Sequence, residues 1–335
     1  MSAMSAPGSA WLPSSRLADN RNETGNVGRM SPLFASVPSP PDNTFAVGPL
    51  EIHFYGLLIA TGAMLAIAIG RRRYVARGGD LEVADGAAFW GLVCGFLGAR
   101  LAYVSTHLDR FEGRPWAILF IWEGGLALFG GLTGGTVGSY LFLRRNNGDI
   151  AAFADSAAPA LPLAQAIGRF GNYFNQELYG TPTTLPWALE IDPANRVSPY
   201  EEFSTFHPTF LYESLYNLVL VGILLLIDRK KVLKRRGSLI FVYGIGYGLG
   251  RFLLELIRTD TTFRLLGLSR NAYVALAVLI AAGVLLYLYE RRAPEALRED
   301  NEPDAPETEE ADEHDEEADE HDEQTGEQPA SAERS

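Results

Sequence analysis

The sequence predicts an all-α polytopic membrane protein, with about seven transmembrane helices and a polar site near the outer interface of the membrane. Apolar segments of about 20 residues recur along the chain, which is the length that an α-helix needs to cross a bilayer. Charge is divided unevenly. The 335 residues have a net charge of −13, but residues 294–335 alone hold nineteen acidic and two basic residues, a net of −17. The rest of the chain, with 22 acidic and 26 basic residues, is a mildly basic and very apolar body.

Two polar segments flank this body. Residues 1–46 are rich in Ser, Pro, Ala, Asn and Gly and lack the apolar run of a secretory signal, so we expect a disordered leader. Residues 294–335 predict a disordered cytoplasmic tail, because they have high charge and almost no apolar side chains to bury. The transmembrane domain is then expected over 47–293. The tail repeats ADEHDEE and ADEHDEQ, whose His314 and His321 could hold a divalent cation weakly or simply be solvated.

The apolar segments themselves give the expected helices. They cover residues 52–70, 86–106, 116–142, 151–171, 208–227, 237–257 and 271–289. The fourth is the weakest, since it is rich in Ala and interrupted by Pro159 and Pro162. Counts of six or eight helices therefore stay open.

Basic residues in alternate loops predict the orientation. They follow the first, third, fifth and seventh segments, as Arg71, Arg72, Arg73 and Arg77, then Arg144 and Arg145, then Arg229, Lys230, Lys231, Lys234, Arg235 and Arg236, then Arg291 and Arg292. Loops on the cytoplasmic side of a membrane carry such an excess. We expect the N-terminus outside and the C-terminus, with its acidic tail, in the cytoplasm.

Composition also excludes several classes of protein. No patch of Lys and Arg interleaved with aromatic residues is present to bind nucleic acid, and an acidic tail would repel it. Cys94 is the single cysteine, so the chain has no intramolecular disulfide. One Cys and five His without a CxxC pair argue against a structural zinc site.

The densest polar cluster ends the fourth segment, in GRFGNYFNQELYG at 168–180. Arg169, Asn172, Asn175 and Glu177 lie there beside an apolar helix, at the outer interface by the predicted orientation. A guanidinium group can grip a phosphate with its planar fork, which favours a site for a lipid headgroup. The alternative is that Arg169 snorkels to the interface while the Asn residues cap the helix.

Three further groups contain charges or polar aromatics at segment ends. Arg251, Glu255 and Arg258 have the spacing of one helical face, and either form an internal ion pair or contribute to a site. His53-Phe54-Tyr55-Gly56 opens the first segment, where a Tyr is often an aromatic anchor. HPTFLYE at 207–213 opens the fifth, as a helix cap or a substrate contact. All four groups fall near the outer interface, and two arginines in an apolar bundle suggest an anionic ligand such as a phospholipid.

Glycine runs occur in the second and third segments. Gly91 and Gly95 form a GxxxG pattern that predicts helix packing. Gly124-Gly125, Gly130-Gly131 and Gly134-Gly135 indicate either packing again or close approach of a lipid or peptide backbone.

Several of these segments together resemble the bacterial phosphatidylglycerol–prolipoprotein diacylglyceryl transferase family. They are HFYG (53–56), GARLAYV (98–104), IWEGGLALFGG (121–131), GRFGNYFNQELYG (168–180), HPTFLYES (207–214) and GRFLLELIRTD (250–260). The resemblance covers roughly residues 50–290, in the order of the family and with its seven-helix topology. It implies a multi-pass protein of the bacterial inner membrane.

The resemblance implies a reaction, its partners and its residues. The family moves the diacylglyceryl group of phosphatidylglycerol onto the thiol of the lipobox cysteine of a prolipoprotein and releases glycerol phosphate, with no metal or cofactor. The catalytic residues implied are Arg169, Arg251, Glu255, Tyr55 and His207. The substrate-binding residues implied are Arg169, Asn172, Asn175, Glu177, His53 and Arg258.

Two positions depart from the enterobacterial members of the family. A histidine proposed there as a general base is replaced by Phe129, and the loop before the seventh segment reads Leu268-Ser269-Arg270-Asn271. We therefore expect Arg169 and Arg251 to supply most of the catalysis, with the thiol proton leaving to water or to His53, His207 or Glu255. The alternatives are an inactive relative that binds lipid or lipoprotein, and a small transporter.

Overall fold

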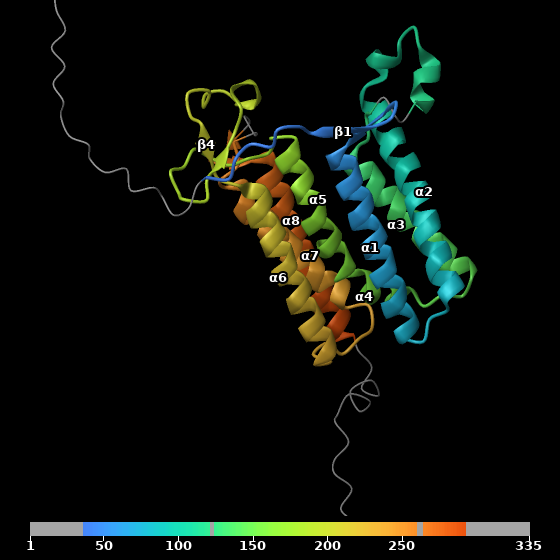
Figure 1. Ribbon diagram of the computed structural model, residues 1–335. Coiled ribbons are helices and arrows are strands. Elements are labelled where there is room, and N and C mark those ends of the chain that lie inside the picture. The colour runs from blue at the N-terminus through green and yellow to red at the C-terminus, as the bar shows by residue number, and fades with distance from the viewer. Residues whose placement is uncertain (1–35, 121–123, 260–263, 293–335) are drawn as a thin grey trace, which may run out of the picture.

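The computed structural model describes residues 36–120, 124–259 and 264–292, which form a bundle of long α-helices (Figure 1). The predicted all-α class is confirmed, since strands among these residues form only short two-stranded ladders. The helices are α1 (Phe54–Ala76), α2 (Leu81–Thr106), α3 (Leu128–Arg145), α4 (Ile150–Ala157), α5 (Ala160–Phe174), α6 (Thr209–Arg229), α7 (Leu239–Glu255) and α8 (Arg270–Arg291). The strands are β1 (Thr44–Val47), β2 (Leu50–His53), β3 (Leu189–Glu190), β4 (Thr205–Phe206), β5 (Arg264–Leu265) and β6 (Leu268–Ser269), and short 3-10 helices cover Leu108–Phe111, Pro115–Leu119 and Pro193–Asn195.

Five helical segments among the described residues are long and apolar enough to cross a membrane. They are Phe54–Ala76, Leu81–Thr106, Ile150–Phe174, Thr209–Arg229 and Arg270–Arg291. Helix α3, with 18 residues, and helix α7, with 17, are shorter but lie in the same bundle, packed against α2 and α8 (Figure 1). The predicted number of seven transmembrane helices is therefore approximate, while the membrane class of the protein is supported by these apolar helices.

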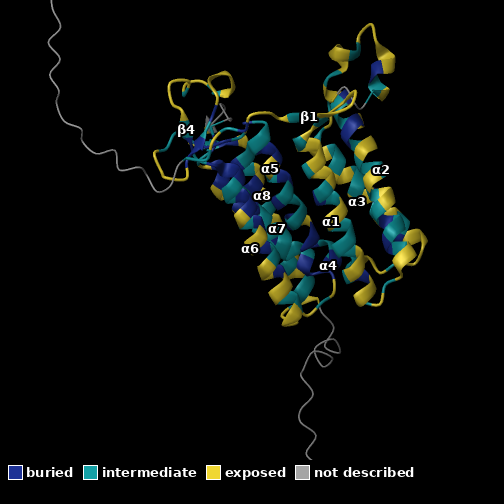
Figure 2. Cartoon of the chain, in the orientation of Figure 1, coloured by how far each residue is buried: buried dark blue, intermediate teal, exposed yellow. Residues whose placement is uncertain are grey.

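The outward faces of the helices carry large apolar side chains. Figure 2 shows exposed positions along the helices that border the bundle. In the most apolar 18-residue stretch of α1, only 6% is buried against other parts of the chain, and Met64 is 62% exposed. In water such a surface would be unfavourable, whereas lipid chains cover it without cost.

The third apolar segment, expected as one helix over 116–142, differs from the prediction. Helix α3 begins only at Leu128, and a 3-10 turn occupies the start of the segment. Gly124 and Gly125 have positive φ angles of 84° and 78°, which place the backbone in the left-handed region. The helix therefore cannot continue through the glycine pair.

A buried arginine holds this irregular segment. Arg100 of α2 is 7% exposed, and its guanidinium donates hydrogen bonds to the carbonyl oxygens of Ala117 (2.6 Å), Ile118 (2.8 Å) and Gly125 (3.1 Å). Backbone carbonyls that a helix would have satisfied are thus satisfied by a side chain. Arg100 belongs to GARLAYV, and its contacts explain why the described residues before Leu128 do not form one helix with α3.

The fourth apolar segment is interrupted at Pro159, whereas Pro162, also expected to interrupt it, lies within α5. Helix α4 ends at Ala157 and α5 begins at Ala160, with Pro159 between them. Asp149 caps α4, because its carboxylate accepts a hydrogen bond from the Ala152 backbone N–H at 2.9 Å.

The glycines of α2 and α3 let the two helices touch through their backbones. A Cβ atom at Gly98 would collide with the carbonyl oxygen of Gly130, and one at Gly134 would collide with the carbonyl oxygen of Cys94. A Cβ at Gly91 would meet the Ser139 hydroxyl. The packing interpretation of the glycine runs is confirmed for these positions.

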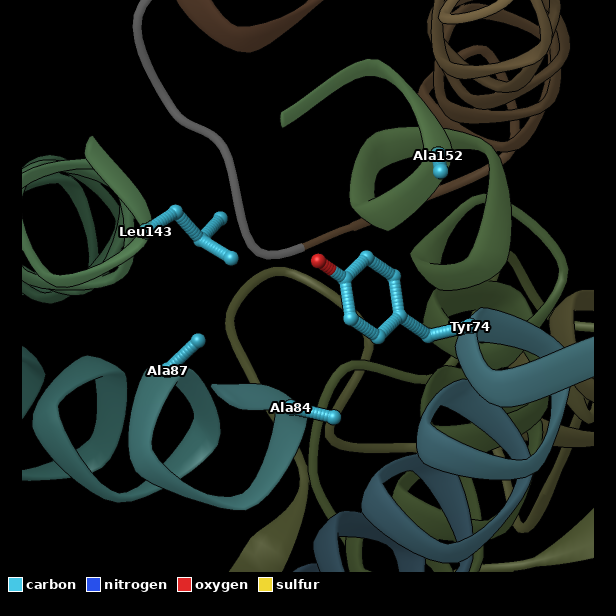
Figure 3. Close-up of a cluster of buried hydrophobic side chains, with 5 residues drawn as sticks. All are labelled: Tyr74, Ala84, Ala87, Leu143 and Ala152. Atoms are coloured by element: carbon cyan, nitrogen blue, oxygen red, sulfur yellow. The ribbon is translucent and has the colours of Figure 1, made fainter. Parts of the chain in front are cut away.

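One buried cluster joins four helices at the end of the bundle that also carries α4. Figure 3 shows Leu143, Ala87, Ala84 and Ala152 around the ring of Tyr74, which is 1% exposed. The Tyr74 hydroxyl accepts a hydrogen bond from the Asp149 backbone N–H at 3.0 Å. This cluster fastens the α2–α3 pair to α1 and α4.

The opposite end of the bundle, which we call the strand end, carries the strands of the described residues (Figure 1). Strands β3 and β4 pair antiparallel there, and Val37 extends this ladder. The Val37 N–H donates to the Ala188 carbonyl (2.8 Å), and the Val37 carbonyl accepts from the Glu190 N–H (2.9 Å). The end with the predicted basic loops is called the basic end.

These contacts correct the boundary of the predicted leader. Val37 pairs with β3 and residues 44–46 belong to β1, so the structure places these residues at the strand end, where the sequence predicted a disordered leader. The leader residues 1–35 lie outside the described residues, as do the acidic tail at 294–335 and its His314 and His321.

Candidate active site at the strand end

The four polar groups predicted from the sequence all lie at the strand end. Arg169 is near the last turn of α5, and Arg251 near the last turn of α7. His53 directly precedes α1, and His207 lies two residues before α6. Elements far apart in the sequence thus bring their polar ends together, as the alternating orientation of the helices requires.

Arg169 belongs to a continuous chain of polar contacts. Its Nη2 lies 2.7 Å from Oε1 of Glu213 on α6, and its Nη1 donates to Oδ1 of Asn172 at 3.0 Å. The Asn172 amide donates in turn to Oε1 of Glu177 at 2.8 Å, and Asn175 donates to the same oxygen at 3.1 Å. Both the oxygen and the nitrogen of the Asn172 amide are therefore hydrogen-bonded. The contacts with Asn172 and Glu213 together fix the orientation of the Arg169 guanidinium.

The sequence produces this arrangement locally. Arg169 and Asn172 are one helical turn apart on α5, so their side chains share a face. The helix ends at Phe174, and Gln176 and Leu178 then adopt positive φ angles of 49° and 59°, which turn the chain so that Glu177 faces back toward the helix end.

Tyr55 reaches the same cluster from α1. Its ring lies against Gly171, where a Cβ atom would collide with it. Phe54 stacks on Phe174 with ring centroids 4.5 Å apart, which fixes the start of α1 beside the end of α5. Tyr55 is 38% exposed, and its ring lies next to the residue that directly precedes Asn172.

The predicted face of α7 carries a buried ion-pair cluster. Glu255 is 2% exposed, and its Oε2 lies 3.0 Å from Arg251 Nη2 and 3.9 Å from Arg258 Nε. Its Oε1 accepts hydrogen bonds from Ser269 Oγ (2.8 Å) and Asn271 Nδ2 (3.2 Å). The ion pair predicted from the sequence is therefore present, and it is supported by the N-cap residue of α8, Ser269, and by Asn271 in the first turn of α8.

Arg251 has a hydrogen-bonding group left over. Its Nη1 is buried and makes no hydrogen bond to any described residue, although the side chain is 16% exposed. A buried guanidinium nitrogen without an acceptor is costly and therefore marks a position where an acceptor is expected to bind.

The two arginine clusters belong to one site. Arg251 lies within electrostatic range of both Glu213 and Arg169. The loop after the Asn172 motif also pairs with the end of α7, since Thr181 N–H donates to the Ile257 carbonyl at 2.9 Å. Gly180 lies at this crossing, where a Cβ would press on His207 and on the Ile257 carbonyl.

The predicted histidines are placed differently from each other. The His207 ring bonds the Tyr212 hydroxyl at 3.1 Å, while its backbone pairs with Thr181 and Gly180. His53 is exposed and makes no side-chain hydrogen bond that caps α1. Phe129, at the first turn of α3, is 68% exposed.

Glu213 has a different role from the one predicted. The sequence suggested a helix cap or a substrate contact for HPTFLYE, whereas Glu213 is 8% exposed and is the carboxylate partner of Arg169. A carboxylate one turn inside an apolar helix is the signal that could have identified it, because such a group requires a cationic partner.

A cap of loops covers the strand end beside this cluster. Gln176 donates to Oδ2 of Asp192 at 2.7 Å and accepts from the Asp192 N–H at 2.8 Å. The hydrogen bond from Gln176, with a second from Ser39, lowers the pKa of the Asp192 carboxyl below its ordinary value. Burial of Tyr179 raises the pKa of its hydroxyl, which bonds the Asn195 carbonyl and the Val197 N–H.

Within the described ranges, no group of three or more His, Cys, Asp and Glu residues could hold a metal ion. The polar groups of the site are guanidinium, amide, hydroxyl and carboxylate groups. Such a set suits a phosphate-containing ligand, which guanidinium groups bind through charge-assisted hydrogen bonds.

Comparisons with known proteins identify similar chains. Residues 42–289 match the model of the prolipoprotein diacylglyceryl transferase family. A phosphatidylglycerol–prolipoprotein diacylglyceryl transferase of Frankia alni is 44% identical over 77% of this chain and 69% of its own length. Proteins of the same name from Frankia casuarinae and Cutibacterium acnes are each 42% identical, over 78% and 77% of this chain and over 64% and 88% of their own lengths.

Proposed function

This chain belongs to the prolipoprotein diacylglyceryl transferase family, and we propose that it transfers the diacylglyceryl group of phosphatidylglycerol to the lipobox cysteine of prolipoproteins. It is a membrane-embedded transferase of lipoprotein biosynthesis, and its reaction is the first step of lipoprotein maturation. The observation that supports the assignment to this site is that two arginines from different helices, each held by a buried carboxylate, lie at the strand end.

The headgroup phosphate binds between Arg169 and Arg251. The free Nη1 of Arg251 and the exposed part of Arg169 are the donors, and Glu213 and Glu255 hold the two guanidinium groups in position. Asn172, Asn175 and Glu177 orient Arg169 and offer polar atoms to the glycerol of the headgroup. His53 and Arg258 complete the set of substrate contacts, and Tyr55 and His207 complete the set of catalytic residues, as the family resemblance implies.

The transfer forms one bond and breaks one. The cysteine sulfur attacks the glyceryl carbon that carries the phosphate, a C–S thioether bond forms, and the C–O bond to the phosphate breaks. The electron pair of that bond stays on the phosphate oxygen, so that glycerol phosphate leaves with an additional negative charge. Arginines fixed at this oxygen stabilise the developing charge by several kcal/mol in a site of low dielectric.

Removal of the thiol proton is the smaller task. A thiol with a pKa of about 8.5 is already a few per cent thiolate at pH 7, so complete deprotonation would gain about 2 kcal/mol. The proton leaves to water or to His53, His207 or Glu255. A base at position 129 is not needed on this account, which agrees with the phenylalanine found there.

The site faces the outside of the bacterial inner membrane. Support comes from the arginines and lysines of the predicted cytoplasmic loops, which lie at the basic end, opposite the site. The N-terminal residues then lie outside and the C-terminal residues in the cytoplasm. Prolipoproteins and phosphatidylglycerol meet the enzyme at the outer leaflet.

One assay tests the function. The purified full chain is incubated with phosphatidylglycerol and a synthetic lipobox peptide, and the peptide is weighed by mass spectrometry. We expect a mass gain of one diacylglyceryl unit on the cysteine and release of glycerol phosphate. A peptide with Ser in place of Cys is the control. Binding of both substrates with no mass gain would contradict the proposed activity.

A further inference from the structure

A strongly basic loop joins α6 and α7 at the basic end. Among residues 229–236, which we call the basic loop, six are Arg or Lys. The side chains at positions 229, 230, 231, 234 and 236 are exposed. Within the described residues, Arg229, Lys230, Lys231 and Lys234 form no ion pair, whereas nearby Asp228 is already occupied by Arg73 and Arg77 at 2.8 and 2.6 Å. The loop thus presents uncompensated positive charge.

The basic loop is fixed against the last turn of α8. Glu290 accepts hydrogen bonds from the backbone N–H of Lys234 (2.9 Å) and of Arg235 (3.2 Å). The Arg235 guanidinium lies 4.0 Å from the ring centroid of Tyr289 and donates to the Tyr289 carbonyl at 3.1 Å. The chain leaves the described residues at Arg292, two residues after these contacts. Everything that follows in the sequence starts beside the basic loop.

The residues that follow carry the opposite charge. Positions 294–335 contain nineteen acidic and two basic residues, including the repeat at 311–324. We propose that this acidic segment binds the exposed face of the basic loop of its own chain. The covalent connection at Arg292 places the partners at an effective concentration of about a millimolar or more, so that even weak pairwise attractions add up to binding.

The membrane surface is the competing occupant of the basic loop. Anionic lipid headgroups attract juxtamembrane Lys and Arg by about 1 kcal/mol for each residue near the surface. Two features favour the acidic segment over the lipid headgroups as the occupant of the basic loop. The segment is attached next to the loop, and its net charge of −17 is larger than the six positive charges of the loop. The proposal is independent of the reaction at the strand end.

The lysines of the chain provide a selective test. The sequence contains three lysines, Lys230, Lys231 and Lys234, and all of them lie in the basic loop. A carbodiimide joins an amine to a carboxylate that touches it without adding a spacer. In the full chain reconstituted in bilayers, each amide link from a lysine side chain therefore reports what covers this loop, and mass spectrometry identifies the linked peptides.

We expect links between these lysines and carboxylates of residues 294–335. In a mixture of isotope-labelled and unlabelled protein, the links join peptides of the same chain. In 1 M salt, where the screening length falls to about 3 Å, their yield drops by about tenfold or more. Lys231→Arg removes the links at that position and leaves those at Lys230 and Lys234, because the charge is kept while the reactive amine is lost.

A second variant keeps the length of the segment. Replacement of every Asp and Glu in 311–323 by Asn and Gln abolishes links to that stretch and raises the rate at which an amine-reactive ester labels the lysines. Links only to Asp228 or Glu290, or only between different chains, would overturn the proposal. So would links that form in zwitterionic bilayers and vanish when phosphatidylglycerol is included, since the lipid headgroup would then be the occupant.

Discussion

At the scale of residues, Arg169 is held by a carboxylate and an amide on two different helices. Its partner Glu213 makes a charge inside an apolar bundle tolerable, and Asn172 sets the plane of the guanidinium. Because both contacts exist before substrate binds, the arginine needs little reorganisation when the phosphate arrives. This is the form of preorganisation that stabilises charge developing in a transition state.

Replacement of Arg169 tests this account. Arg169→Ala should lower the rate of lipid transfer by about 10²-fold or more, since loss of one donor to a developing oxyanion has that effect in other enzymes. Arg169→Lys keeps the charge but loses the planar fork, so we expect an intermediate rate. Rates are measured with the lipobox peptide, and thermal unfolding of each variant controls for folding. An Arg169→Ala enzyme with full activity would rule out the proposed mechanism.

The exposed Phe129 allows a test of the role of proton removal. In Phe129→His, the transfer rate at pH 7 should change by less than about tenfold, because a thiolate is already present and leaving-group departure limits the reaction. Phe129→Leu is the matched control for loss of the ring. An increase well above tenfold for the histidine variant alone would show that deprotonation is limiting.

At the scale of elements, the α2–α3 pair depends on glycines that place the two backbones in contact. Hydropathy predicted both segments, but the start of α3 depends on a tertiary contact. Arg100 holds the carbonyls of the preceding segment, and the left-handed Gly124 and Gly125 end any helix there. The described residues of the third apolar segment that precede Leu128 therefore form a 3-10 turn and a loop, and they do not continue α3.

Two identical substitutions distinguish packing from helix propensity. Gly134→Ala places a methyl group on the Cys94 carbonyl and should destabilise the protein by about 1–3 kcal/mol. Gly70→Ala in α1 meets open space and should leave stability unchanged or raise it by up to about 1 kcal/mol. Melting temperatures in detergent measure the difference. Equal effects of the two changes would contradict backbone contact between α2 and α3.

At the scale of the whole molecule, polar chemistry and positive charge occupy opposite ends of the bundle. The site lies at the strand end, and the arginine and lysine loops lie at the basic end. A protein divided in this way has one favourable orientation in a bacterial membrane, with the basic end in the cytoplasm. In the proposed orientation, substrates that arrive from the outer leaflet would meet the arginine cluster directly.

Labelling of single cysteines tests the orientation. In a Cys94→Ser background, Glu202→Cys at the strand end should react with a membrane-impermeant maleimide in intact cells. Arg145→Cys at the basic end should react only after the cells are opened. Both native residues are exposed, so accessibility of the side chain does not limit labelling. The reverse pattern would place the site in the cytoplasm and contradict the predicted topology.

The sequence alone determined the membrane class, the approximate helices and the positions of Arg169, Arg251 and Glu255 at helix ends. These features follow from local rules, because the thickness of a bilayer sets the length of an apolar run and a charge within such a run is costly. The tertiary structure decided that Glu213 of α6 pairs with Arg169 of α5, that Arg100 displaces the start of α3, and that residues 36–46 join the strand end. Each of these contacts joins residues on different elements, and only the packing of the helices brings such residues within hydrogen-bonding distance.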